Sequence, residues 1–233
     1  MIKSFLILIN LSMLLFASKQ IVLVVSDDFN SSVAKMECYE DSTLTCGDIS
    51  VNIGKNGLGW GLGEVELTQK TSEPLKFEGD KKAPVGVFRL SAIFGYEAKE
   101  TYKTPYLFAS EKLICVDDGD SPFYNKLKIA EGNEKSFEFM RREDSQYKIG
   151  IVVEHNKKAL SQRGSCIFMH IQRGEKTPTS GCTSMKEEDM AKIANWLDEN
   201  KNPILIQIPR SSRGEILRLY PQLNKSELLR DED

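Results

Sequence analysis

The chain has 233 residues, of which 28% are charged and 40% are hydrophobic, an ordinary composition for a globular protein. A chain of this length can bury one large core, so we expect one domain of somewhat under about 200 residues with short extensions. The net charge of −3 at pH 7 provides no basic field, and we therefore expect no nucleic-acid partner.

The first 18 residues, MIKSFLILINLSMLLFAS, have the layout of a secretory signal peptide. A lysine precedes a mainly apolar run (5–16), and the small residues Ala17 and Ser18 follow it. The run is too short to span a bilayer comfortably. An uncleaved N-terminal anchor is the alternative, and this segment would then be the chain's only contact with a membrane. We expect export to the periplasm or another extracytoplasmic space.

Export affects the interpretation of the five cysteines, because an oxidising compartment favours disulfide bonds. The stretch CYEDSTLTC has a turn-like centre, so Cys38 and Cys46 are a candidate pair across a hairpin. The odd count leaves one thiol unpaired. For Cys166, three interpretations stay open: a neighbour of a catalytic site, a disulfide partner of Cys115, or an inert buried thiol.

Residues 20–209 are predicted to form a mostly-β domain. Runs that are rich in β-branched residues, or that alternate apolar with polar residues, indicate strands. The predicted strands are QIVLVV (20–25), AKMECYE (34–40), DISVNIGK (48–55), VFRLS (87–91), KLICV (112–116), KIGIVVEH (148–155), SCIFMHI (165–171) and PILIQIP (203–209). The glycine-rich segment GKNGLGWGLG (54–63) is predicted to be a flexible loop, because its glycines fit neither a phosphate-binding loop nor a dinucleotide fingerprint.

Two further features concern turns and helices. The acidic residues 117–120 lack calcium-loop spacing and are predicted to be a solvated turn. One clear helix follows residue 184, where Ser184 and Glu187 form a capping-box pattern that places the helix start at Ser184. The charged residues 210–233 are predicted to be a surface helix or a tail.

The stretch SCIFMHIQRGEKTPTSGCTSM holds the strongest candidates for chemistry. His170 ends a predicted strand, and Cys182 comes twelve positions later, after a polar loop that can fold back on the strand. The predicted helix start near Cys182 would favour a thiolate, and the imidazole of His170 would supply a base. The backbone N–H of Cys182 is a candidate oxyanion donor, and Gly181 would allow close approach of a substrate. The alternative is a satisfied core histidine and an inert buried cysteine; His155 is read as structural in the same way.

The segment PTSGCTSM, preceded by IFMHI, resembles the catalytic segment of the L,D-transpeptidase (YkuD-type) domain family. APVGVFRL resembles that family's Thr-Pro-x-Gly-x-Phe segment. The pattern is most similar to an exported branch with a GSCIF-x-HI strand and a Pro-Thr-Ala/Ser-Gly-Cys loop, and the likeness extends through NIGKNGLGWG, CVDD, MRREDSQY and WLDENKNP. The resemblance implies a mostly-β fold, with a sandwich or barrel-like sheet and a helix after the catalytic cysteine.

The resemblance also implies an activity on peptidoglycan stem peptides that uses no cofactor and no metal. Cys182 would be acylated at the carbonyl between an L- and a D-centre, His170 would act as general base, and the Gly181–Cys182 region would form the oxyanion hole. An acceptor amine or water would then resolve the thioester. A hydrolytic L,D-carboxypeptidase and an inactive wall-binding module are the alternatives.

Two departures from the family pattern concern recognition of the substrate carboxylate. Ser180 stands where the broader family has a histidine, and Ser184 stands where it has an arginine. Ser180 is a candidate substrate-binding residue, and the carboxylate must be met by another cation, because bidentate carboxylate binding suits arginine. The candidates are Arg141, Arg142, Arg163 and Arg173.

Overall fold

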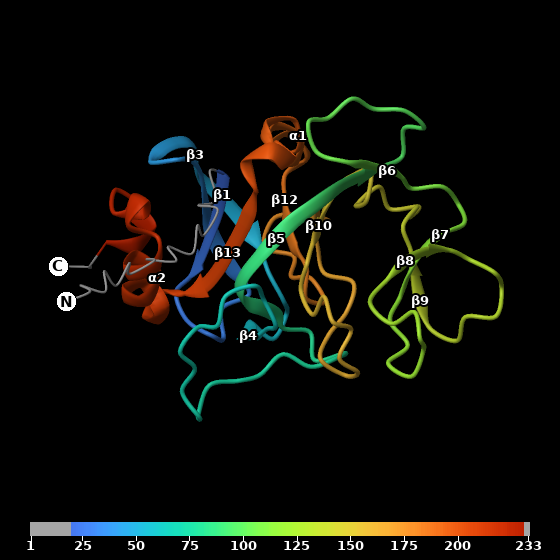
Figure 1. The fold of residues 1–233 in the computed structure, drawn as a ribbon, viewed down its shortest axis with the longest axis horizontal. Coiled ribbons are helices and arrows are strands. Elements are labelled where there is room, and N and C mark those ends of the chain that lie inside the picture. Colours follow the sequence, from blue (N-terminus) through green and yellow to red (C-terminus); the bar gives the residue numbers. More distant parts are fainter. Residues whose placement is uncertain (1–19, 231–233) are drawn as a thin grey trace, which may run out of the picture.

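The structure is a computed structural model that describes residues 20–230. Its strands form one large sheet and one small sheet, with the helices on the outside (Figure 1). The strands are β1 (Gln20–Ser26), β2 (Val33–Glu40), β3 (Thr43–Asn52), β4 (Leu58–Trp60), β5 (Ala83–Gly95), β6 (Tyr106–Phe108), β7 (Leu113–Val116), β8 (Leu127–Ile129), β9 (Phe137–Phe139), β10 (Ile149–Val153), β11 (Phe168–Ile171), β12 (Thr183–Met185) and β13 (Ile204–Pro209). The α-helices are α1 (Glu187–Trp196) and α2 (Arg213–Leu219). The short 3₁₀ helices are Glu199–Lys201, Arg210–Ser212, Pro221–Leu223 and Glu227–Leu229.

The large sheet closes on itself like a barrel. Its neighbouring strands run β10-β11-β12-β3-β2-β1-β13-β5, and β5 pairs back with β10. Strand β5 allows this because it is 13 residues long: residues 86–89 pair with β13 and residues 90–95 with β10. A register shift in the β5–β10 ladder, typical of a bulge, bends the sheet where the barrel closes. The expectation of a mostly-β, barrel-like fold is therefore confirmed.

The core lies inside this barrel. All residues of β1 and β13 are buried, and the two strands run parallel to each other. Strands buried on both faces appear in a sequence as continuous apolar runs, which explains QIVLVV and PILIQIP. Helix α1 covers β10 and β11 with Met190, Ile193 and Ala194, so its apolar stripe faces the sheet.

The glycine-rich segment 54–63 is ordered, which corrects the prediction of a flexible loop. It contains β4, whose three residues are buried and which pairs in parallel with the start of β5. Gly57 has a φ of +74°, and a Cβ there would lie 2.0 Å from the carbonyl oxygen of Phe29. Here glycine permits close backbone packing rather than flexibility.

The predicted helix start at Ser184 is wrong. Ser184 is a buried residue of β12, and α1 begins at Glu187 with Lys186 as its N-cap and no side-chain capping bond. The parallel pairing of β12 with β11 takes precedence over the local capping pattern. The acidic first turn of α1 still suits the positive end of the helix dipole.

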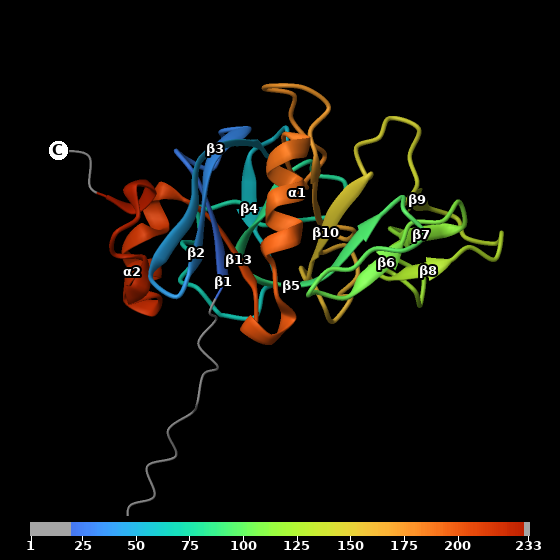
Figure 2. The same ribbon diagram turned by 90° about the horizontal axis from the view of Figure 1, so that it is seen from above.

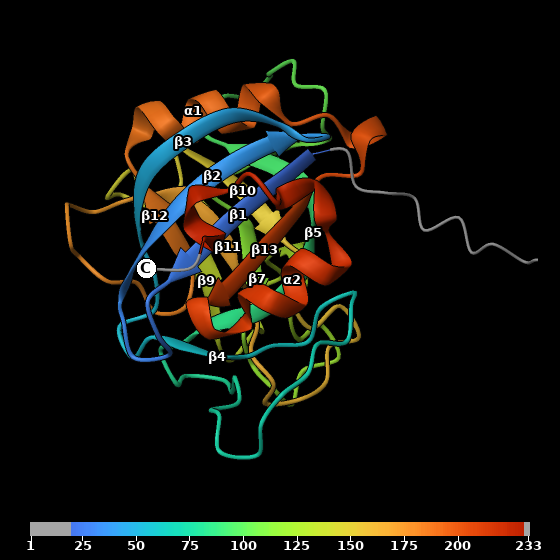
Figure 3. The same ribbon diagram turned by 90° about the vertical axis from the view of Figure 1, so that its left-hand side faces the viewer.

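The segment after β13 folds back onto the barrel. Ile216, Leu223 and Leu229 are buried, and α2 lies at the opposite end of the molecule from the small sheet (Figures 2 and 3). The predicted signal peptide, 1–18, lies outside the described residues. Within residues 20–230, no helix is long and apolar enough to cross a membrane.

The small sheet has the order β8-β7-β9 and stands beside the barrel end that carries β10 (Figure 1). A disulfide between Cys115 in β7 and Cys166, just before β11, joins it to the barrel. The buried aromatic residues Phe94, Tyr147 and Phe168 pack edge to face between the two sheets. A second disulfide joins Cys38 and Cys46 across the β2–β3 hairpin, as the sequence indicated.

Candidate active site

The register of β11 and β12 brings His170 and Cys182 to one face of the sheet. The strands are parallel, and His170 lies opposite Ser184. Side chains alternate along a strand, so Phe168 shares a face with His170, and Cys182 shares a face with Ser184. Cys182 precedes β12 by one residue and lies beside Phe168, whose backbone N–H donates to the sulfur at 3.3 Å. Two residues twelve positions apart in sequence are therefore brought to the same face of the sheet, on adjacent strands.

The loop that carries Cys182 is fixed by Thr179. The backbone of Thr179 bonds to both neighbours of Gly54, at the start of the glycine-rich segment: its N–H donates to Ile53 O at 3.0 Å, and its carbonyl accepts from Lys55 N at 2.9 Å. Its hydroxyl donates to Cys182 O at 2.6 Å and accepts from Gly181 N at 3.0 Å. Thr179 therefore sets the position of the Gly–Cys turn.

Gly181 has a φ of +145°, a conformation that other L-residues rarely adopt. A Cβ there would lie 3.0 Å from Lys82 O and 3.5 Å from Ile167 Cδ1. The N–H of Gly181 is already used by Thr179, so the N–H of Cys182 is the better candidate for an oxyanion donor. Gly181 thus shapes the turn that presents the sulfur.

Cys182 carries the free thiol. All five cysteines lie within the described residues, and the other four form the two disulfides. The thiol donates to Cys166 O at 3.6 Å. Of the interpretations left open for Cys166, the structure therefore supports two together: Cys166 is the partner of Cys115 and also a neighbour of the candidate nucleophile.

One ring nitrogen of His170 is held by a backbone carbonyl. His170 is buried, and its Nδ1–H donates to the carbonyl of Ile171 at 2.8 Å, since a carbonyl oxygen can only accept. This bond fixes the tautomer and leaves Nε2 with a lone pair. The ring packs against Tyr147, with centroids 5.2 Å apart. Burial lowers the pKa of His170 to about 4, so the imidazole is neutral near pH 7.

The thiol of Cys182 is not ionised by a helix, which corrects the expectation of a thiolate at a helix start. Residues 183–185 are a strand, and the first turn of α1 lies further along the chain. Burial raises the pKa of the thiol to about 12, and the nearby carboxylate of Glu138 acts in the same direction. Near neutral pH the pair therefore rests as thiol and imidazole.

A cavity of about 450 Å³ surrounds the pair. Of the residues that the sequence singled out, it is lined by Cys182, His170, Gly181, Ser180, Arg142 and Arg173. A larger hollow of about 1290 Å³ lies near residues 60–69 and α2, but its lining contains neither cysteine nor histidine. The smaller cavity is thus the candidate active site.

Arg141 and Arg163 do not line this cavity, so we remove both from the candidate site. The guanidinium of Arg141 donates to Ala109 O at 3.0 Å and to Tyr96 O at 2.6 Å, and it stacks on the Tyr96 ring. The guanidinium of Arg163 donates to Lys76 O at 3.3 Å. Both arginines tie backbone segments together.

The other two arginines line the cavity, but only one of them is paired with a carboxylate. Arg142 forms a bidentate pair with Asp144, at 3.0 and 2.6 Å, and lies over the ring of Tyr147. Arg173 is exposed, and its guanidinium makes no hydrogen bond or ion pair within the part of the chain that the structure describes. Arg173 is therefore the arginine available to a ligand.

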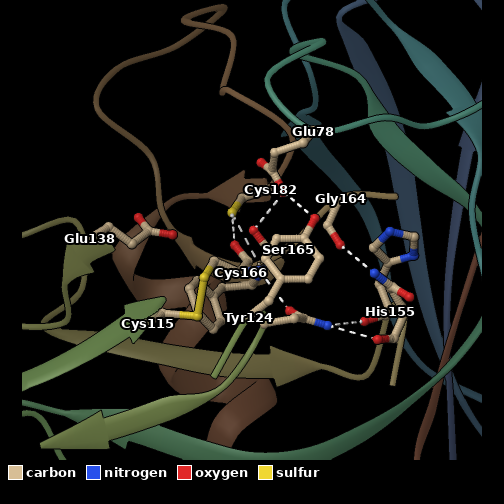
Figure 4. The surroundings of a disulfide bond; sticks show 12 residues. Glu78, Cys115, Tyr124, Glu138, His155, Gly164, Ser165, Cys166 and Cys182 are labelled. Atoms are coloured by element: carbon tan, nitrogen blue, oxygen red, sulfur yellow. Dashed lines mark hydrogen bonds between the residues drawn. A yellow bond between two sulfur atoms is a disulfide. The ribbon is translucent and has the colours of Figure 1, made fainter. Parts of the chain in front are cut away.

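A hydrogen-bonded network supports the site from one side (Figure 4). Glu78 accepts from the hydroxyl of Tyr124 and, at 2.7 Å, from that of Ser165. The next residue, Cys166, donates its N–H to Asn125 Oδ1 at 2.9 Å. The network fixes the backbone that contacts the sulfur of Cys182.

The other side of the cavity holds residues that the sequence did not single out, and it corrects the prediction of a solvated turn at 117–120 for Asp117, whose Oδ1 is buried. Tyr147 donates its hydroxyl to Glu138 Oε2 at 2.9 Å, and both residues line the cavity with Asp117. The quoted motif MRREDSQY contains Tyr147, which could have marked it. In SFEFM, Glu138 alternates with two phenylalanines, a weak sign of an inward-facing acid on a strand.

His155 is structural. It is buried, accepts from the N–H of Leu62 at 3.2 Å, and donates through Nε2 to Arg163 O at 2.9 Å. Burial lowers its pKa to about 4. Within residues 20–230, no group of three or more His, Cys, Asp or Glu side chains is arranged to hold a metal ion.

A comparison with known protein families identifies the family of the chain. The model of the L,D-transpeptidase catalytic domain (YkuD) matches residues 22–206, which include both His170 and Cys182. The chain belongs to this family. L,D-transpeptidase domains are cell-wall enzymes that act on peptidoglycan. No curated protein and no solved structure matches the chain significantly.

Within the L,D-transpeptidase domain, the matched range extends from β1 almost to the end of β13. It covers the closed barrel and the small sheet, and it stops before α2. The α2 segment lies outside the matched range.

Proposed function

We propose that this protein is a cysteine L,D-transpeptidase that acts on peptidoglycan stem peptides through a thioester on Cys182. One observation carries the proposal: the free thiol shares a face of the sheet and a cavity with a histidine whose Nδ1 is held by a backbone carbonyl, which leaves Nε2 as an acceptor. Nucleophile and base in such an arrangement suit acyl transfer.

The first step joins proton transfer to attack. Both groups are neutral at rest, so Nε2 of His170 takes the thiol proton as the sulfur adds to the carbonyl carbon. The N–H of Cys182 is the proposed donor to the resulting oxyanion. The imidazolium then protonates the leaving amine, and the terminal D-residue departs. An acyl group remains on the sulfur.

Recognition of the substrate carboxylate is assigned to Arg173. Its side chain is exposed at the cavity and has no partner among residues 20–230, whereas the guanidinium of Arg142 is neutralised by Asp144. The family's arginine is replaced here by Ser184, and Arg173 would supply the missing positive charge. Ser180, which also lines the cavity, is proposed to contact the substrate beside it.

The second step transfers the acyl group to an amine, which makes a cross-link or attaches a new residue. Transfer to water gives the hydrolytic reaction of an L,D-carboxypeptidase from the same acyl-enzyme. Incubation with purified muropeptides, followed by mass spectrometry, distinguishes the two by their products.

We propose that the protein works in an extracytoplasmic compartment. The two disulfides support this, because such bonds persist in oxidising environments. Expression with the first 18 residues fused to a reporter, followed by fractionation, tests export directly. A reporter that stays in the cytoplasm would contradict it.

Covalent capture by a carbapenem-type acylating agent tests the site. The wild type should gain one adduct, and Cys182→Ala should gain none, because the nucleophile is removed. His170→Ala should slow capture by about a hundredfold or more, the contribution typical of a general base. Intact-mass spectrometry over time measures both.

The matched control is the double variant Cys38→Ala/Cys46→Ala, which removes two sulfurs away from the cavity and should still be captured once. An adduct on Cys182→Ala would show that Cys182 is not the nucleophile. An unchanged rate of capture by His170→Ala would show that His170 is not the general base.

A further inference from the structure

The wall of the cavity that the small sheet provides is acidic near the sulfur. Glu138 lies on β9, and Figure 4 shows its carboxylate extending toward Cys182, with Glu78 on another side of the sulfur. Oε2 of Glu138 accepts from Tyr147. Its Oε1 makes no hydrogen bond or ion pair within residues 20–230. One carboxylate oxygen therefore remains for a ligand.

Two of the four lysine and arginine residues in the cavity lining are already paired with carboxylates. Lys76 is almost fully buried and pairs with Asp80 at 2.6 Å. Arg142 pairs with Asp144. Neither cation forms an ion pair with Glu138, although Arg142 acts to lower its pKa. The other two, Arg173 and Lys81, lie at exposed positions of the cavity lining and make no ion pair within residues 20–230. The cavity is thus acidic by the sulfur and basic further out.

A buried hydrogen-bond acceptor without a donor also indicates that this part of the cavity suits a ligand with N–H groups. Oδ1 of Asp117 is buried, has no hydrogen-bond partner in the described chain, and belongs to a residue of the same cavity lining. A buried acceptor without a donor is costly unless a ligand or water supplies one. Asp117 also acts to raise the pKa of Glu138, so the two carboxylates lie near each other.

We propose that Glu138 binds the acyl acceptor as a primary ammonium group and positions its nitrogen at the Cys182 thioester. The inference rests on the proposed function, and it assigns the acceptor chemistry: an amine rather than water. An ammonium has three donors and no acceptor, which matches a wall of carboxylate oxygens.

Glu138 can also take the proton that the acceptor must lose. Burial raises the pKa of Glu138 to about 7, with Asp117 and Glu78 acting in the same direction and Tyr147 and Arg142 acting against it. The ammonium gives one proton to the carboxylate, and the freed lone pair attacks the thioester carbon. A second N–H proton passes by way of His170 to the departing sulfur, so an amide forms and the C–S bond breaks. Protonated Glu138 then returns its proton to water.

The partition of the acyl-enzyme between acceptors tests the proposal. The full chain, with both disulfides intact, is acylated with a stem tetrapeptide at pH 7. Glycinamide, which is cationic, and hydroxylamine, which is mainly uncharged, then compete separately with water. Mass spectrometry gives the ratio of transfer product to free acid in each case.

Glu138→Gln keeps an acceptor for Tyr147 but removes the charge. It should lower the glycinamide-to-water ratio by about tenfold, the effect expected from losing one charge-assisted hydrogen bond. The hydroxylamine-to-water ratio should stay within about twofold on the same argument. Glu138→Asp, which keeps the charge, should recover part of the ratio. Glu143→Gln, an exposed carboxylate outside the cavity, is the matched control and should match the wild type.

An unchanged glycinamide ratio in Glu138→Gln would overturn the inference. So would an equal loss with glycinamide and hydroxylamine, since that would mark a structural role. Failure of the wild type to form any acyl-enzyme is a separate result, because it would overturn the proposed function itself.

Discussion

Burial acts in opposite directions on the two candidate catalytic side chains, and it keeps both neutral. It raises the pKa of Cys182 to about 12 and lowers that of His170 to about 4. Both shifts follow from the cost of charging a group away from water. The nucleophile is therefore generated when the substrate carbonyl is attacked, and not in advance.

This predicts an unusual pH profile for acylation. Only neutral His170 can act as base, so kcat/KM should fall as the pH drops through the pKa of about 4. The profile should be flat between about pH 6 and 8, because the thiol does not ionise there. Stopped-flow acylation with a carbapenem-type reagent measures this. A limb near the ordinary histidine pKa, or a rise of about tenfold per pH unit above pH 7 from thiolate formation, would contradict it.

At the scale of elements, the site is a strand pair with a long loop between its members. The N–H of β11 residue Phe168 contacts the sulfur, and the loop is held by Thr179 to the segment that leads into β4. The glycine-rich segment thus has a positioning role, since its backbone fixes the loop that presents Cys182.

Thr179→Val tests this coupling. Valine preserves the shape but removes the two hydroxyl bonds to Cys182 O and Gly181 N. The free energy of unfolding should fall by about 1–3 kcal/mol. Acylation kcat/KM should drop by about tenfold or more because the sulfur is less well positioned. Chemical denaturation and acylation kinetics measure the two effects.

Thr101→Val, at an exposed position, is the control and should change neither quantity. Full acylation by Thr179→Val, together with lowered stability, would show that the hydroxyl supports the fold without positioning the sulfur.

At the scale of the whole molecule, the link between the small sheet and the barrel is the feature that completes the candidate site. The Cys115–Cys166 disulfide closes 51 residues of sequence, whereas Cys38–Cys46 closes 8. The small sheet also brings Glu138 to a cavity whose other walls come from the barrel. The site is therefore shared between the two sheets.

The two disulfides should differ in their effect on stability. On the chain-entropy model, Cys115→Ala/Cys166→Ala should lower the free energy of unfolding by about 4 kcal/mol, and Cys38→Ala/Cys46→Ala by about 2.5 kcal/mol. Equilibrium denaturation of the wild type and the two double variants measures this. A larger loss from the hairpin pair would contradict the loop-length argument.

The sequence by itself determined the local features. Continuous apolar runs predicted β1 and β13, and the motif segments singled out His170 and Cys182 and the family. The spacing of Cys38 and Cys46 indicated their pairing. These inferences succeeded because each depends on residues that are close in sequence or on a motif of fixed spacing.

Only the tertiary structure decided the rest. The short strands β4, β6, β8, β9 and β12 have too few residues to leave a period in the sequence, and their partners are distant along the chain. Pairing with β11 placed Ser184 in a strand and moved the helix start, and burial reversed the expected ionisation of Cys182. Glu138, Tyr147 and Asp117 became part of the candidate site because folding stacks one sheet beside the other. Burial and long-range pairing are properties of the folded chain, so a local pattern does not contain them.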